Sequence, residues 1–96
     1  MRRQNFDIKK RLPSIPNAPG VYFFRGAHRR ILYIGKAANL KERISSYRNP
    51  NGLSPAKKKM LPEIRQIDYR VTSSEIGALI EEALAIKKFH PPYNVL

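Results

Sequence analysis

Two short apolar runs in the first third of the chain predict a β-hairpin. The run "VYFF" occupies positions 21–24, directly after Gly20, and the run "ILYI" occupies positions 31–34. Both runs are rich in aromatic and β-branched residues, which are typical of strands. The segment between them contains a glycine, which favours a turn. We therefore expect an antiparallel pair over residues 20–34, with Gly35 ending its second strand.

Capping signals predict three helices. Asn39 can cap a helix that runs to about Tyr47, and Ser54 can cap a second helix in which Pro55 takes the first helical position. The capping signature "TSSE" opens the longest helix, which is expected over residues 74–88. An apolar stripe on this last helix is expected to face the sheet. Its members are Ile76, Leu79, Ile80, Ala83 and Ile86.

A third strand is predicted between the second and the last helix. The segment "QIDYRVT" at positions 66–72 alternates Ile67, Tyr69 and Val71 with polar residues, as a half-buried strand does. The order strand, strand, helix, helix, strand, helix predicts an α/β domain with a small, three-stranded, largely antiparallel sheet flanked by helices. Too few strands alternate with helices for a doubly wound sheet.

The chain length and the terminal segments predict one domain. With 96 residues, the chain divides into a basic, proline-containing lead-in at 1–19 and a domain at 20–96. The absence of cysteine excludes a disulfide framework and thiolate metal sites. No apolar run approaches the roughly 18 residues of a membrane helix, and the basic N-terminus lacks the apolar stretch of a secretory signal. These features predict a cytoplasmic protein.

Basic residues strongly outnumber acidic ones. The chain has 19 Lys and Arg against 7 Asp and Glu, which gives a net charge of +12. Such an excess favours a polyanionic partner, most often nucleic acid. A basic surface that is simply solvated is the alternative. A membrane surface is less favoured, because no helix is apolar on one face and basic on the other.

Candidate chemistry gathers around the predicted hairpin and the helix after it. If that helix begins directly after the second strand, Lys36, Arg43 and Tyr47 share one of its faces. A solvated basic face with Tyr47 in the core would give the same pattern. The nearby Tyr22 and Tyr33 favour a site, because exposed phenols beside cations are unusual. A shared site requires both hairpin tyrosines on one face of the sheet.

These residues lie in motifs that resemble a known family. The segments "GVY" at 20–22 and "YIG" at 33–35 resemble the signature pair of the GIY-YIG nuclease superfamily, with Val21 replacing the usual first-motif Ile. Within it, "YIGKAANLKERISSY", "TSSEIGALIEEALAIKK" and "PPYNV" resemble the N-terminal nuclease domains of the UvrC family and its shorter homologue Cho. The resemblance covers roughly residues 8–95. It implies the GIY-YIG fold and an endonuclease that nicks DNA in nucleotide excision repair.

The resemblance assigns roles to matching residues. It implies that Tyr33 is the general base on the attacking water and that Tyr22 positions this water or the phosphate. Arg43 matches the arginine that stabilises the pentacovalent phosphate, and Lys36 and Tyr47 match further site residues. A free phenol titrates near pH ~10, so a base at neutral pH needs cations close by to favour the phenolate. Lys36 and Arg43 are expected to supply them.

The resemblance also implies one divalent metal ion, Mg²⁺ or Mn²⁺. Its pattern selects Glu82 as the metal ligand, although Glu81 stands where an apolar residue is more usual. On a helical wheel Glu82 lies at the edge of the expected buried stripe and Glu81 points nearly opposite, so Glu81 is expected in solvent. Asn94, in the terminal "YN", matches a further site residue. Gly20 and Gly35 are expected to be structural, and Gly35 lets the backbone pass close at the strand-to-helix turn.

DNA is the expected partner, together with other subunits of an excision repair complex, and no membrane is expected. Candidate DNA contacts outside the site are basic residues of the hairpin turn and the second helix: Arg29, Arg30, Lys57, Lys58 and Lys59. Two alternatives stay open for the same fold. One is a DNA-binding module without catalysis, and the other is an interaction domain that docks to a repair complex.

Overall fold

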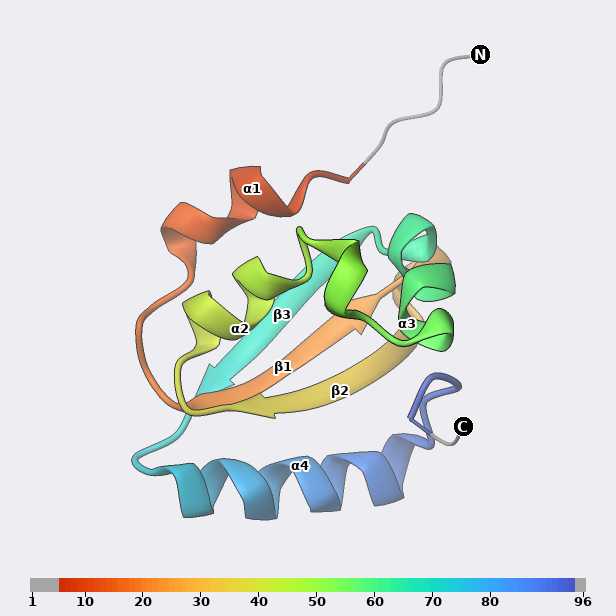
Figure 1. Ribbon diagram of the computed structural model, residues 1–96. Coiled ribbons are helices and arrows are strands. Elements are labelled where there is room, and N and C mark those ends of the chain that lie inside the picture. The colour runs from red at the N-terminus through yellow and green to blue at the C-terminus, as the bar shows by residue number, and fades with distance from the viewer. Residues whose placement is uncertain (1–5, 95–96) are drawn as a thin grey trace.

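A three-stranded antiparallel sheet forms the middle of the protein, with helices on both of its faces (Figure 1). Its strands are β1 (Gly20–Arg25), β2 (Ile31–Ala37) and β3 (Gln66–Val71), in the spatial order β2-β1-β3. The central strand β1 pairs antiparallel with both neighbours. The predicted fold class and the predicted order of strands and longer helices are confirmed.

The computed structural model describes residues 6–94, so the first five residues of the lead-in and residues 95–96 of the predicted domain lie outside it. The described part of the lead-in packs on the sheet. It contains the short helix α1 (Ile8–Arg11), and its Ile15 is buried in the core. Over the described chain, no helix is long and apolar enough to cross a membrane.

The hairpin places Tyr22 and Tyr33 on one face of the sheet, as a shared site requires. Tyr22 pairs with Gly35 and Phe24 pairs with Tyr33, so the two tyrosines are diagonal neighbours. Gly35 does not end the second strand, and this prediction is wrong: β2 continues to Ala37. The glycine has no positive φ, and the pairing with β1 keeps the backbone extended through it.

Three longer helices follow the hairpin, at the predicted positions. They are α2 (Leu40–Ser46), α3 (Pro55–Met60) and α4 (Glu75–Phe89). The side chain of each predicted N-cap accepts a backbone N–H of its helix, in the order Asn39, Ser54 and Ser74. Because α2 begins only at Leu40, Lys36 belongs to β2. The prediction that Lys36 shares a helix face with Arg43 is therefore wrong.

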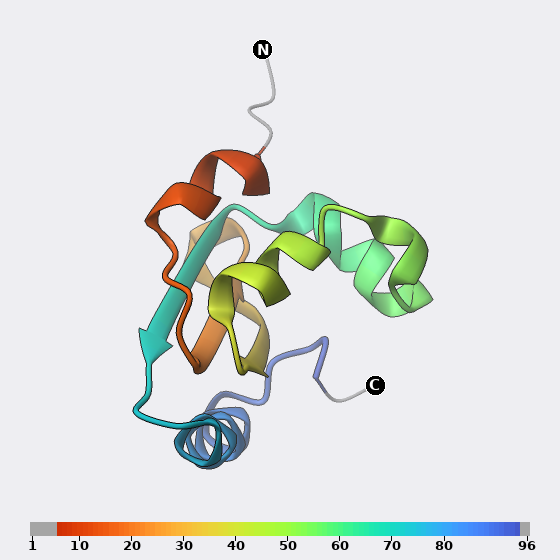
Figure 2. The same ribbon diagram turned by 60° about the vertical axis from the view of Figure 1, so that its left-hand side comes forward.

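Alternate residues of β1 divide the core between the two faces of the sheet. Tyr22 and Phe24 belong to the larger apolar cluster on the side of α2 and α3. Val21 and Phe23 belong to a smaller cluster, to which α4 contributes Ala78. Figure 2 looks nearly along α4 and shows it below the strands and apart from α1, α2 and α3. Residues from the two sides of the sheet can therefore meet only around its edges.

Helix α4 contacts the sheet with a different face from the predicted one. Ala78 is buried, and Ala85 and Ile86 pack against the smaller cluster. Most of the predicted stripe lies in solvent instead, with exposed fractions of 71% for Ile76, 50% for Leu79 and 55% for Ile80, and Ala83 is exposed as well. The sheet presents bulky Phe23 and Ile34 here, so alanines on the helix let the two elements pack closely.

The stability of an Ile80 variant tests which face of α4 packs on the sheet, and Ile44 of α2 serves as a buried reference. Replacing Ile80 with Gln is expected to change the free energy of unfolding by less than about 0.5 kcal/mol, because the side chain is largely in solvent. Replacing the fully buried Ile44 of α2 with Ala should lower it by about 2–5 kcal/mol. Urea unfolding followed by circular dichroism measures both. A loss of several kcal/mol in the Ile80 variant would support the face predicted from sequence.

Candidate active site

Three tyrosines from separate elements pack together on the α2 and α3 side of the sheet. Tyr22 comes from β1, Tyr33 from β2, and Tyr47 from the C-cap of α2. We call them the tyrosine cluster. The hydroxyls of Tyr22 and Tyr47 are hydrogen-bonded at 2.8 Å, and the ring centroids of Tyr22 and Tyr33 are 6.2 Å apart. The structure thus brings together all three predicted tyrosines.

The members of the tyrosine cluster differ in burial. Tyr22 is 1% exposed and Tyr47 is 2% exposed, whereas Tyr33 is only half-buried. Burial raises the pKa of Tyr22 well above its ordinary value, and the adjacent Tyr47 adds to this. Burial also raises the pKa of Tyr47. Tyr22 and Tyr47 therefore stay protonated at neutral pH, which leaves Tyr33 as the phenol that a substrate can reach.

Gly35 provides the space in which the Tyr22 ring lies. A Cβ atom at this position would stand 2.7 Å from Cε1 of Tyr22 and closer still to its Cζ and hydroxyl. The missing side chain lets the ring cross β2 and reach Tyr47. Gly20 has a similar role, because a Cβ there would be 2.8 Å from Cδ1 of Leu40 and would overlap the Arg70 carbonyl. Both glycines are required for close packing within the sheet.

Lys57 of α3 reaches the same cluster. Its ammonium lies 5.0 Å from the ring centroid of Tyr33 and 5.8 Å from that of Tyr47. Burial lowers the pKa of Lys57, but the phenols of Tyr47 and Tyr33 outweigh this effect and the pKa is raised. The side chain is therefore a cation at neutral pH. Sequence reasoning treated it only as a DNA contact, although Met60, one turn later, marks the buried face of α3.

Lys36 of β2 and Arg43 of α2 line one cavity that also reaches α4. This cavity has a volume of about 330 Å³ and is also lined by Glu75 and Leu79 of α4. Lys36 follows Gly35 in the strand, so its side chain points to the face opposite Tyr33. The two predicted cations are thus neighbours, but they come from β2 and α2.

The two adjacent glutamates of α4 differ in their partners. Glu81 accepts a hydrogen bond from Arg70 of β3 at 2.8 Å, so the prediction that it points away from the sheet is wrong. The ion pair forms because α4 contacts the sheet along Ala78, Ala85 and their neighbours. Within residues 6–94 the half-buried Glu82 has neither a hydrogen bond nor an ion pair. Its carboxylate is therefore available to an external ligand.

Glu82 fits the metal ion that the family resemblance implies. The described part of the chain contains no group of three or more His, Cys, Asp or Glu that could enclose a metal. Magnesium takes oxygen ligands and keeps several of its waters, so a single carboxylate can hold it. This donor set excludes a structural zinc site among the described residues and suits a hydrated Mg²⁺ or Mn²⁺.

Asn94 holds the outer edge of β2. Its Oδ1 accepts from the backbone N–H of Ile34 at 2.8 Å, and its Nδ2 donates to the Ile34 carbonyl at 2.9 Å. The backbone N–H of Tyr93 donates to Leu32 of the same strand at 3.0 Å. The Asn94 amide is thereby engaged with backbone, next to Tyr33. These bonds tie residues 93–94 to the strand that carries this tyrosine.

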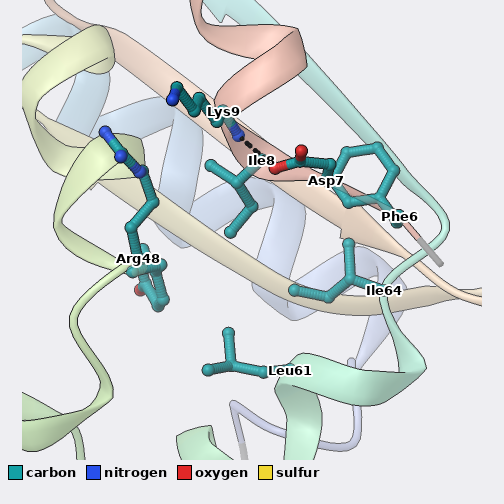
Figure 3. Close-up of a pocket in the computed structure, with 8 residues that line it drawn as sticks. Phe6, Asp7, Ile8, Lys9, Arg48, Leu61 and Ile64 are labelled. Atoms are coloured by element: carbon teal, nitrogen blue, oxygen red, sulfur yellow. Dashed lines mark hydrogen bonds between the residues drawn. The ribbon is translucent and has the colours of Figure 1, made fainter.

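A second cavity, of about 360 Å³, lies between α1, the end of α2 and the segment after α3 (Figure 3). Ile8, Leu61 and Ile64 give it apolar walls. Its carboxylate, Asp7, is already bonded to the backbone N–H of Lys9 at 3.0 Å. Tyr47 alone of the predicted site residues lines this cavity, so it is a packing space beside the site.

Comparisons with known proteins agree on one family. A family model described as UvrC-like GIY-YIG domain matches residues 18–95. Proteins named UvrABC system protein C are 41% identical over 97% of this chain in Pseudomonas entomophila and 48% identical over 88% of it in Methanospirillum hungatei. The chain spans only 15% and 16% of the length of these two relatives.

A solved structure matches the fold closely. The GIY-YIG N-terminal endonuclease domain of UvrC from Thermotoga maritima, bound to magnesium as its catalytic cation, superposes with a TM-score of 0.81. It is 38% identical, and the match covers 92% of this chain and 96% of that one. Point mutants of that domain, with Tyr replaced by Phe or Asn by Ala, match equally well.

Proposed function

Because the chain belongs to the UvrC-like GIY-YIG domain family, we propose that it is a metal-dependent DNA endonuclease that nicks one strand in nucleotide excision repair. The observation that carries the proposal is Tyr33, the accessible member of the tyrosine cluster, beside the ammonium of Lys57. The proposed partners are DNA and other subunits of an excision repair system.

The proposed reaction is an in-line displacement at phosphorus. The phenolate of Tyr33 takes a proton from the attacking water, whose oxygen forms the new bond to phosphorus as the ester bond to the leaving oxygen breaks. Arg43 can donate two parallel hydrogen bonds to the phosphate oxygens, and Lys36, which lines the same cavity, adds a second positive charge. The protonated Tyr22 supports the Tyr33 ring through a tilted ring contact, and Tyr47 in turn contacts the Tyr22 ring edge-on.

Glu82 is the residue that would hold the divalent metal ion. When bound, this ion supplies positive charge that stabilises the phosphate and the leaving oxygen. The proposal is supported by the free Glu82 carboxylate and by the paired state of Glu81, which Arg70 already neutralises.

The contacts to DNA are proposed to run through phosphates. Arg29 and Arg30 of the hairpin turn and Lys58 and Lys59 of α3 are exposed. Lysine and arginine contacts to phosphate carry no sequence information, so we expect binding without sequence preference. The net charge of +12 supports the same mode.

A plasmid nicking assay tests the proposed function. We expect conversion of supercoiled to open-circular DNA in Mg²⁺ or Mn²⁺, no conversion in EDTA, and faster nicking of damaged duplex. The Tyr33→Phe variant keeps the ring and its packing but lacks the oxygen, so it is expected to be inactive while binding DNA normally. DNA binding without nicking in any metal would favour the catalytically inactive module, and absence of DNA binding would favour the interaction domain.

A further inference from the structure

Lys57 differs from the two lysines that follow it in α3. Lys58 and Lys59 are exposed, whereas Lys57 is half-buried and its ammonium lies 5.0 Å from the Tyr33 ring centroid. The fully buried Met60 fixes this orientation, since residues three apart share a helix face. The packing of α3 therefore directs the Lys57 side chain towards Tyr33.

We propose that Lys57 is a positioning residue of the active site, whose ammonium stabilises the negative charge that Tyr33 carries before it accepts the proton of the attacking water. The inference rests on the proposed role of Tyr33 as the base. In this step one O–H bond of water breaks and the proton moves to the phenolate oxygen, while Lys57 keeps all its protons. Lys57 acts only through Tyr33.

The cation that lies over the Tyr33 ring is Lys57. The titratable groups packed against Tyr33 on its face of the sheet are Tyr22 from β1, Tyr47 from the end of α2 and Lys57 from α3. Lys36 points to the opposite face, where it lines the cavity beside α4. The cation that sequence reasoning expected to act on Tyr33 is therefore on the other side of the strand.

The remaining charged groups near the cluster have other partners. Arg43 acts on Tyr22, where it slightly opposes the rise in pKa that burial causes. Tyr93 packs on the same apolar cluster, but its hydroxyl donates to Glu63. Two buried neutral phenols disfavour an anion beside them, because they add low-dielectric surroundings without charge.

The pH dependence of nicking tests the proposal. Because the Lys57 ammonium lies 5.0 Å from the Tyr33 ring centroid in a partly buried site, we expect removal of this cation to shift the pH of half-maximal single-turnover rate upwards by roughly one unit, or about tenfold in rate near neutral pH. Lys57→Met removes the charge and keeps the stem, and Lys57→Arg restores it. The Arg variant should keep the wild-type profile. A uniform loss at every pH, or no loss, overturns the proposal.

Lys58→Met is the matched control, with the same charge change one position along the same helix. It should lower DNA affinity at least as much as Lys57→Met does, because Lys58 is exposed and can contact a phosphate whereas Lys57 turns towards Tyr33. At saturating DNA its pH profile should stay where the wild-type profile is. An equal shift in both variants would mean that net charge, and not the position of Lys57, sets the profile, and would overturn the proposal.

A second measurement needs neither DNA nor metal. The near-ultraviolet absorbance of tyrosinate is titrated in the wild-type protein and in Tyr33→Phe, and the difference isolates the ionisation of Tyr33. The same difference in the Lys57→Met background should have its midpoint about one pH unit higher. If no protein nicks DNA but this midpoint moves, the charge effect stands and the proposed function fails. A midpoint that does not move overturns the proposal in either case.

Discussion

Metal-dependent nicking is expected to fall by roughly a thousandfold when Glu82 is replaced with Gln. A bound metal ion lowers the activation free energy by several kcal/mol, and each step of about 1.4 kcal/mol corresponds to a tenfold change in rate. Glutamine keeps the size and helix propensity of the residue but removes the charge through which a hard cation is bound. Single-turnover nicking in Mg²⁺ measures the rate. Paramagnetic resonance of Mn²⁺ measures binding of the metal without DNA, and its affinity should fall as well.

Glu81→Gln is the matched control for this prediction. It makes the same charge change one position earlier and breaks the exposed pair with Arg70, which is worth at most about 1 kcal/mol. Nicking should stay within a few-fold of wild type, and Mn²⁺ affinity should be unchanged. Loss of both in Glu81→Gln with full activity in Glu82→Gln would show that the metal ligand is the other glutamate. Activity in both variants would contradict a carboxylate-bound metal altogether.

The elements of the fold could be predicted because their signals are local. Asn39, Ser54 and Ser74 cap helices by bonding to amides a few residues away, and strand residues such as Ile67 follow a two-residue alternation. Each of these patterns is complete within a few neighbouring positions. The family motifs added the tyrosines, which the structure gathers into one cluster.

The orientation of α4 could not be predicted from its own sequence. Its apolar residues surround most of the helix, so a wheel offers more than one possible buried face. The choice is made by the sheet, where Phe23 and Ile34 leave space for Ala78, and by Arg70, which binds Glu81. These partners are distant in sequence. The choice of Glu82 as the metal ligand stays a prediction, and the helical wheel placed its neighbour Glu81 wrongly.

The positions of the cations in the site also could not be predicted from the local sequence. Lys36 was assigned to a helix because Gly35 was expected to end the strand, whereas strand pairing continues to Ala37. This one change turns Lys36 to the face opposite Tyr33. The three consecutive lysines of α3 do not by themselves indicate which one turns inward, and only the packing of the helix identifies Lys57.

Replacing Gly35 with Ala is expected to destabilise the protein by roughly 3 kcal/mol, the upper part of the range for overpacking, and to lower nicking by about a hundredfold. The new Cβ would overlap the Tyr22 ring, which is 1% exposed and has no free space to enter. Displacement of the ring breaks the 2.8 Å hydrogen bond to Tyr47 and moves the support of Tyr33. Urea unfolding and single-turnover nicking measure the two effects.

A glycine outside the site and a double-mutant cycle make this prediction specific. A Cβ at Gly52 meets nothing within 4 Å, so Gly52→Ala should leave the stability unchanged or raise it by up to about 1 kcal/mol. In a Tyr22→Leu background the ring is absent, and Gly35→Ala should then cost less than about 1 kcal/mol, because the two changes share one contact. Equal costs of Gly35→Ala with and without the ring would mean that strand pairing, and not the crossing of β2 by Tyr22, requires a glycine at this position.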